Sequence, residues 1–178
     1  MNLKDEQRSV VRRAVLGGVL CAVLLSGAYF LLPRFVELPV ELTARFGFAL
    51  KANIVPLLWV MLGVRLVARG RFHSEADIGG SAAGPPSPVL AVRSAFLQNT
   101  LEQAFLAAGA NLALAATAGG AWLGLIVASV VLFSIGRLAF YVGYPHGAGA
   151  RAFGMAVTAV PALVCLVGAV ALGIAGLV

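Results

Sequence analysis

The sequence predicts an all-α integral membrane protein, a helical bundle of about five transmembrane helices. Of its 178 residues, 61% are hydrophobic and only 11% are charged, whereas a soluble domain usually carries about 25% charged residues. The apolar residues fall in long runs, and about 20 of them in a helix cross the hydrocarbon core of a bilayer. The formal net charge is +6, but the basic residues flank the apolar runs and form no stripe with interleaved aromatics, which argues against nucleic-acid binding.

Five segments are long enough to span a membrane. They are expected at residues 14–32, 46–67, 89–116, 122–144 and 152–177. The first follows a basic start and is not followed by a small-residue cleavage site, so we expect a retained anchor and not a signal peptide. This division predicts an N-terminal part, residues 1–45, with one extra transmembrane helix, and a four-helix membrane domain, residues 46–178.

The connections between the later segments are rich in glycine and proline. The polar loop at residues 69–88 contains Gly-Gly-Ser-Ala-Ala-Gly-Pro-Pro, which cannot continue a helix. Gly119 and Gly120 end the third segment, and the shortness of this turn predicts an antiparallel hairpin with the fourth. The many Gly and Ala residues of the last three segments allow close helix contacts in lipid.

The positions of Lys and Arg predict the orientation, because cytoplasmic loops carry an excess of both. With the N-terminus inside, only Arg34 and Arg45 lie outside, and Lys51 lies within a helix. The residues then at cytoplasmic ends are Lys4, Arg8, Arg12, Arg13, Arg65, Arg69, Arg71, Arg93, Arg137 and Arg151. We therefore expect a multi-pass protein with a cytoplasmic N-terminus and an external C-terminus.

Polar residues within the third and fourth segments are candidate ligand-binding groups, because an unpaired charge in a membrane costs several kcal/mol. Asn99 and Glu102 are three residues apart and share a helix face. Arg137, Tyr141 and Tyr144 follow an i, i+4, i+7 pattern and form one stripe. Both sets are expected near the cytoplasmic face, where Arg would bind a carboxylate and Glu an amine of a small zwitterion. The alternative is that Glu102 and Arg137 only neutralise each other and hold the bundle together.

Two further charged residues lie beside these segments. Arg151 begins the fifth segment at the same interface, and it is either part of the chemistry or an ordinary anchor that extends to the headgroups. Asp77 lies in the polar loop, where it is either functional or a plain solvated charge. We find no phosphate-binding glycine loop, no Ser-His-Asp arrangement and no metal-ligand spacing, so no metal site is predicted.

The order and spacing of these residues resemble a known family, the membrane-associated proteins in eicosanoid and glutathione metabolism (MAPEG). Residues 98–103, which contain Asn99 and Glu102, are similar to the family's Asn-x-x-Glu element. Residues 136–144, in which Arg137 precedes Tyr144 by seven positions, resemble its third-helix signature.

Two more positions extend the resemblance. Arg151 matches the arginine that starts the family's fourth helix, and residues 65–72 followed by Asp77 are similar to the basic end of its first helix and its acidic loop. The resemblance covers about residues 46–178, which leaves the first segment as an addition to a family that typically has four spans.

The resemblance implies a homotrimer that binds glutathione between subunits near the cytoplasmic face. It also implies a glutathione-dependent transferase or peroxidase that acts on a lipophilic electrophile from the bilayer. The residues that would hold glutathione are Asn99, Glu102, Arg137, Tyr141 and Tyr144, and the candidate catalytic residues are Arg151, which would stabilise the thiolate, and Asp77.

The sequence also departs from the family pattern. Ala95, Leu97 and Gln98 stand where catalytic members usually carry arginines. Phe140 replaces an aromatic hydroxyl, and Ala152 replaces a serine that some members use. These departures leave open a second hypothesis, a non-catalytic protein of the same fold that binds membrane lipids or acts as a scaffold.

Overall fold

The computed structural model describes residues 2–82 and 84–176, and within them it contains helices and no strands. The α-helices are α1 (Leu3–Leu31), α2 (Leu42–Ala52), α3 (Ile54–Phe72), α4 (Pro88–Thr117), α5 (Leu123–Gly143) and α6 (Ala148–Ala175). Short 3-10 helices at Leu32–Arg34, Gly120–Trp122 and Tyr144–His146 lie in the connections. The predicted all-α class is confirmed.

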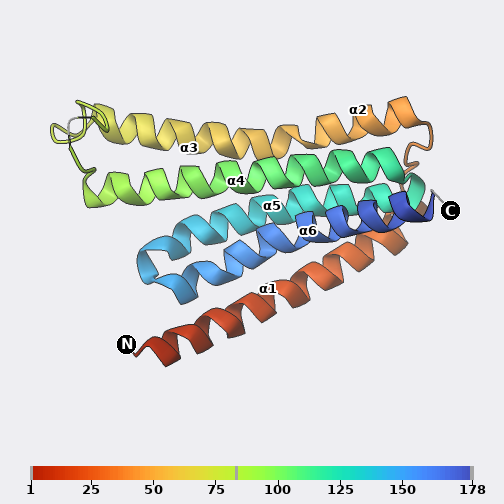
Figure 1. Cartoon of the computed structure of the whole chain (residues 1–178), viewed down its shortest axis with the longest axis horizontal. Coiled ribbons are helices and arrows are strands. Elements are labelled where there is room, and N and C mark those ends of the chain that lie inside the picture. The colour runs from red at the N-terminus through yellow and green to blue at the C-terminus, as the bar shows by residue number, and fades with distance from the viewer. Residues whose placement is uncertain (1, 83, 177–178) are drawn as a thin grey trace.

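The helices lie side by side along one long axis (Figure 1). The start of α1, the loop between α3 and α4 and the turn between α5 and α6 lie at the same end of the bundle. The α2–α3 pair packs on α4, whereas α1 packs on α5 and α6. Helix α1 is therefore an integral part of the bundle.

Within residues 2–82 and 84–176, four helical segments, and not the expected five, are long and apolar enough to cross a membrane. They are Leu3–Arg34, Leu42–Phe72, Gly120–His146 and Ala148–Ala175. Helix α4 is as long as its neighbours and lies among them, but polar residues such as Arg93, Asn99 and Glu102 lower its hydropathy. Several of its polar groups, including Thr100, Gln103 and Asn111, are buried inside the bundle. The chain is an integral membrane protein in which one polar helix is sheltered by apolar ones.

Small residues set how closely α1 approaches its neighbours. A Cβ atom on Gly17 would lie 3.0 Å from the Cβ of Ala156, and one on Gly124 would lie 2.5 Å from the carbonyl oxygen of Ala28. Such distances leave no room for a larger side chain, so the α1 backbone packs directly on α6 and α5. The basic start of the chain is also helical, because α1 begins at Leu3 and not near Ala14.

The second predicted span is interrupted at Asn53, where α2 ends and α3 begins. Pro56 has no N–H to donate to the carbonyl of Ala52, which weakens the helix at this point. At this break the side chain of Asn53 donates from Nδ2 to the carbonyl oxygen of Ala108 on α4 at 3.2 Å. Its Oδ1 accepts from Asn111 Nδ2 at 2.8 Å, and Asn111 Oδ1 accepts from Ser129 Oγ at 3.0 Å. This chain of hydrogen bonds joins the break to α4 and α5.

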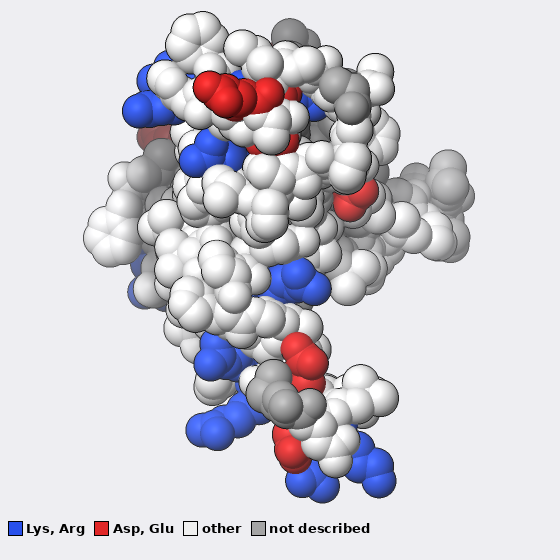
Figure 2. All heavy atoms as spheres, turned by 90° about the vertical axis from the view of Figure 1, so that its left-hand side faces the viewer, with Lys and Arg blue, Asp and Glu red and all other residues white. Residues whose placement is uncertain are grey.

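Figure 2 looks onto the end of the bundle that carries the start of α1. Lys and Arg side chains are distributed around this face, together with a smaller set of acidic ones. At the opposite end, Arg34 lies in the 3-10 helix after α1 and Arg45 lies near the start of α2. This distribution is the one on which the predicted cytoplasmic position of the N-terminus depends, and the orientation itself remains a prediction.

Candidate functional site

The contact between α5 and α6 determines where the candidate residues lie. A Cβ atom on Gly143 would lie 2.5 Å from the carbonyl oxygen of Ala150, and one on Gly154 would collide with the backbone nitrogen of Phe140. The two helices therefore approach at backbone distance next to the turn that joins them. This turn carries Tyr144 on one side and Arg151 on the other.

Arg137 is the most unusual side chain of the bundle, because it is completely buried. Its Nη1 donates to Asn99 Oδ1 on α4 at 2.7 Å. Its Nε and Nη2 both donate to Thr158 Oγ1 on α6, at 3.1 and 2.9 Å. The guanidinium also lies 4.7 Å from the centre of the Phe140 ring and 5.8 Å from that of Phe133. Neutral acceptors and aromatic faces thus solvate the charge and join α4, α5 and α6.

Glu102 is not the partner of Arg137, so the alternative in which these two residues neutralise each other is wrong. The Glu102 side chain is exposed and accepts from Gln98 Nε2 at 2.9 Å. It shares the outer face of α4 with Leu101, Phe105 and Leu106, which are also exposed. The three-residue spacing placed Asn99 and Glu102 on neighbouring positions of the helix, but only Asn99 turns inward.

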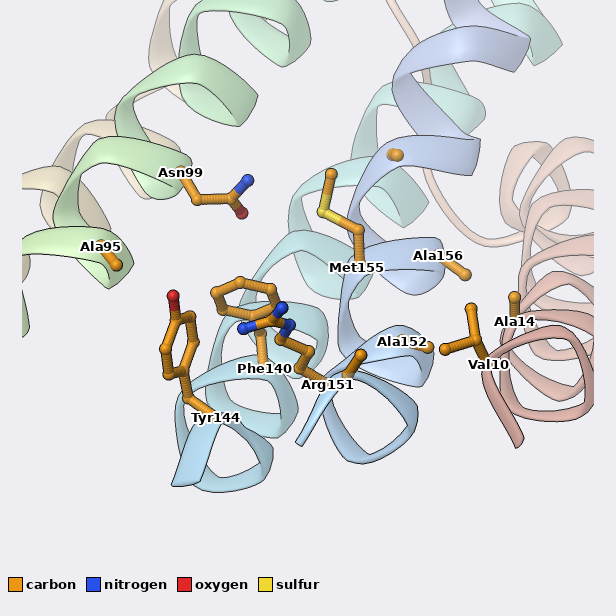
Figure 3. Close-up of a pocket in the computed structure, with 12 residues that line it drawn as sticks. Val10, Ala14, Ala95, Asn99, Phe140, Tyr144, Arg151, Ala152, Met155 and Ala156 are labelled. Atoms are coloured by element: carbon orange, nitrogen blue, oxygen red, sulfur yellow. The ribbon is translucent and has the colours of Figure 1, made fainter. Parts of the chain in front are cut away.

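A cavity of about 560 Å³ opens beside Arg151 (Figure 3). Helices α1, α4, α5 and α6 and the α5–α6 turn all contribute to its walls. The lining residues are Val10, Ala14, Ala95, Asn99, Phe140, Tyr144, Ala148, Arg151, Ala152, Met155, Ala156 and Ala159. Its surface is largely apolar, so the few polar side chains that reach it determine what it can recognise.

Three predicted site residues meet in this cavity. Arg151 stacks on the ring of Tyr144, with its guanidinium carbon 4.7 Å from the ring centre. Among residues 2–82 and 84–176, no hydrogen bond or ion pair engages that guanidinium. The Tyr144 hydroxyl points toward Ala95 and Asn99 (Figure 3). Because the Oδ1 of Asn99 accepts from Arg137, its Nδ2 donor is the group left for the cavity. Arg151 thus turns into the bundle and does not extend outward as a simple anchor.

Tyr141 does not line this cavity. It is half-buried, and its ring packs edge-on against Phe96 of α4 at 4.8 Å between centres. The i, i+4, i+7 stripe on α5 therefore divides into a buried Arg137, a packing residue at Tyr141 and a cavity residue at Tyr144. Only the last of these offers a free polar group to a ligand in the cavity.

Asp77 lies apart from Arg151, in a different cavity beside the α3–α4 loop. Its side chain is only 4% exposed, so the description as a plain solvated charge is wrong. Its carboxylate accepts from Ser87 N at 2.8 Å and from Ser87 Oγ at 2.6 Å. Ser87 in turn caps α4, because its Oγ accepts from Leu90 N at 3.3 Å. Asp77 therefore organises the loop that leads into α4.

Several residues of the site were not predicted from the sequence. Thr158 is the main acceptor for Arg137, and Phe140 forms part of the cavity wall. Met155 faces the same space from α6, and Val10 and Ala14 come from the added helix α1 (Figure 3). Apolar residues carry no spacing signal for a cavity. Thr158, however, is the only hydroxyl residue of α6, and a buried arginine requires acceptors.

The comparison with known families agrees with this arrangement. The sequence pattern of the MAPEG family matches residues 47–171, which include α3 to α5 and most of α6. No individual curated protein and no solved structure is significantly similar to the chain.

The environment of Arg137 predicts that Thr158→Val lowers the stability of the bundle. The substitution keeps the shape of the side chain but removes the acceptor of two guanidinium hydrogen bonds. A hydrogen bond to a charged group contributes about 1.5–3 kcal/mol to stability. We expect a loss of about that size in the free energy of unfolding in detergent micelles. Thr100→Val is the matched control, because buried Thr100 donates only to Phe96 O within its own helix. Equal losses for the two variants would contradict this role of Thr158.

The hydrogen bonds to Asp77 predict a loss of stability in acid. The side-chain and then the backbone hydrogen bond of Ser87 lower the pKa of Asp77 from its ordinary value of 3.8. The stabilisation is therefore complete above that ordinary value and disappears as the pH falls through the lower pKa of the folded state. Carboxyl groups titrate between about pH 2 and 5. As the pH is lowered through this range, the unfolding temperature of Asp77→Asn should fall less steeply than that of the unmodified protein. Glu75→Gln, in the same loop and exposed, should retain the slope of the unmodified protein.

Proposed function

This chain belongs to the MAPEG family, and from that premise we propose that it is a glutathione-dependent transferase or peroxidase acting on lipophilic electrophiles from the bilayer. The observation that supports this most directly is the guanidinium of Arg151. It stacks on Tyr144 in a largely apolar cavity and has no carboxylate partner in the described part of the chain. A cation in such surroundings favours the ionised form of a ligand thiol.

The residues present fit the thiol end of glutathione. Arg151 offers unpaired donors, Tyr144 a phenol and Asn99 an amide N–H, all on one cavity. Bound glutathione would supply the sulfur nucleophile for either reaction. At an electrophilic carbon the new C–S bond would replace the bond to a leaving group or add across an activated double bond. At a hydroperoxide the O–O bond would break, an alcohol would leave, and a second glutathione would convert the sulfenic acid to the disulfide and water. The contribution of the chain would be to hold the sulfur beside Arg151 and to keep it ionised, because the thiolate is the reactive form.

Arg137 supports the site indirectly in this proposal. Its guanidinium is occupied by Asn99, Thr158 and two aromatic rings, so it does not reach a ligand in the cavity. It instead engages the oxygen of the Asn99 amide and leaves the Nδ2 donors free. This replaces the sequence-based expectation that Arg137 itself binds a carboxylate of the tripeptide.

Glu102 and Tyr141 would act, if they bind glutathione, from outside the cavity of a single subunit. The Glu102 carboxylate lies on the outer face of α4 among exposed apolar residues, including Leu101 and Phe105. A carboxylate facing hydrocarbon is costly, so this face favours contact with protein. The proposed homotrimer would cover it and bring Glu102 to a subunit boundary. Membrane insertion with a cytoplasmic N-terminus would open the Arg151 cavity toward the cytoplasm, where glutathione is abundant.

Substitution of Arg151 tests the proposal. In the purified full chain, glutathione is expected to develop thiolate absorbance and to conjugate a generic electrophile at neutral pH. Arg151→Ala should lower the conjugation rate by about 10²-fold or more, the range associated with loss of a group that stabilises developing or resident charge. Arg65→Ala removes an exposed arginine of α3 that does not line the cavity, and it should retain the rate. Absence of a glutathione-dependent signal in the unmodified protein, or a signal unchanged in Arg151→Ala, would contradict the proposal.

The largely apolar lining of the cavity favours one competing function, lipid binding without catalysis. A thermal-shift titration separates the two. A ligand at about 100 times its dissociation constant stabilises the folded state by about 2.7 kcal/mol. A shift with glutathione that Arg151→Ala abolishes supports the enzyme, whereas a shift with a membrane lipid and none with glutathione supports the scaffold.

A further inference from the structure

The added helix α1 lies outside the family match at residues 47–171, yet it reaches the candidate site. Val10 and Ala14 form the side of the cavity that faces the start of α6 (Figure 3). One turn before them, Glu6 is the acidic residue of α1 that is turned toward the bundle, because it is half-buried whereas the adjacent Asp5 is exposed. Helix α1 therefore contacts the site through the apolar side chains of Val10 and Ala14, and Glu6 forms a hydrogen bond to the start of α6.

Glu6 performs at the start of α6 the function that an N-cap residue usually performs. The first N–H groups of a helix have no partner within the helix, and the residue before it normally supplies an acceptor side chain. Here that residue is Gly147, which has no side chain and whose φ of +93° is in the region that favours glycine. The acceptor comes from α1 instead, because Glu6 Oε1 accepts from the backbone N–H of Ala148 at 3.2 Å. Its negative charge also suits the positive end of the helix dipole.

Side chains of the same part of α1 pack closely against the turn. A Cβ atom on Gly149 would collide with the hydroxyl of Ser9, and one on Gly147 would lie 3.4 Å from Glu6 Oε1. Ala148 is the first residue of α6, and Arg151 follows three residues later, in the same helical turn. The contact of Glu6 with Ala148 therefore lies within one helical turn of Arg151.

We propose that Glu6 is a positioning residue of the candidate site, which caps α6 from the added helix and thereby holds Arg151 at the cavity. The effect on glutathione rests on the proposed function, whereas the capping of α6 does not. Glu6 touches neither the cavity nor Arg151, so it is not a catalytic residue. Arg13 and His146 are the charged or titratable residues that line the adjacent cleft between α1 and the turn.

Three variants of the full chain separate positioning from a direct effect of charge. Glu6→Ala removes the acceptor and the charge, Glu6→Gln keeps an acceptor oxygen without the charge, and Asp5→Ala removes the neighbouring exposed carboxylate as a control. If Glu6 positions Arg151, Glu6→Ala raises the pH midpoint of thiolate formation by about half a unit or more, about a threefold change in the ionisation constant. Glu6→Gln and Asp5→Ala leave it unchanged. A purely electrostatic role predicts the opposite sign, because loss of a negative charge lowers that midpoint in both Glu6 variants.

Hydrogen exchange of the backbone amides at residues 147–151 provides a readout that does not need glutathione. Loss of an N-cap acceptor should reduce their protection by about fivefold in Glu6→Ala, with little change in Glu6→Gln. Unchanged protection in Glu6→Ala overturns the proposal. If the unmodified protein shows no thiolate but the exchange result holds, the proposed function fails and the capping role stands. If Glu6→Ala does not fold, Glu6→Asp replaces it, because its side chain is one methylene shorter. This variant should show a smaller loss of exchange protection at residues 147–151. Unchanged protection in Glu6→Asp would then overturn the proposal.

Discussion

The buried guanidinium of Arg137 is the interaction on which the arrangement of α4, α5 and α6 depends. A positive charge inside a membrane bundle must be compensated, and here the compensation comes from neutral oxygens on two neighbouring helices and from two aromatic faces. Because these acceptors lie on different helices, the charge can be solvated only when all three are in place. The same contact orients Asn99 and so determines which of its polar groups reaches the cavity.

Much of the fold follows from simple sequence properties. The apolar runs predicted the helical bundle, and Gly119 and Gly120 predicted the end of α4, which closes at Thr117. The interruption at Asn53 was not predicted, because hydropathy continues through it and only the pairing with Ala108 and Asn111 reveals its role. The polar residues of α4 lower its hydropathy, so that hydropathy alone does not identify it as a membrane-spanning helix. Its burial among other helices, which a one-dimensional hydropathy profile does not contain, makes its polar residues compatible with the membrane.

The candidate site was predictable in part. Arg151, Tyr144 and Asn99 meet in one cavity, which agrees with the similar depth near the cytoplasmic face that the sequence predicted for them. Periodicity could not distinguish Glu102 from Asn99, because a spacing of three identifies a broad face of a helix and not the rotation of that helix toward its partners. It was also unable to connect Glu6 with Ala148, a contact across 142 positions of sequence. Both misses concern how helices are placed relative to one another.

The packing around Gly136 has a consequence for how this segment can vary. A Cβ atom at that position would occupy the space of Thr158 Oγ1, the same oxygen that accepts from Arg137. Two successive residues of α5 therefore depend on the same atom of α6. Gly136 leaves space for Thr158 Oγ1, and Arg137 donates hydrogen bonds to it. Replacing the glycine by alanine would displace the arginine's acceptor without touching the arginine. The contact between α5 and α6 thus requires both glycine at position 136 and arginine at position 137, and neither can be replaced without affecting the other.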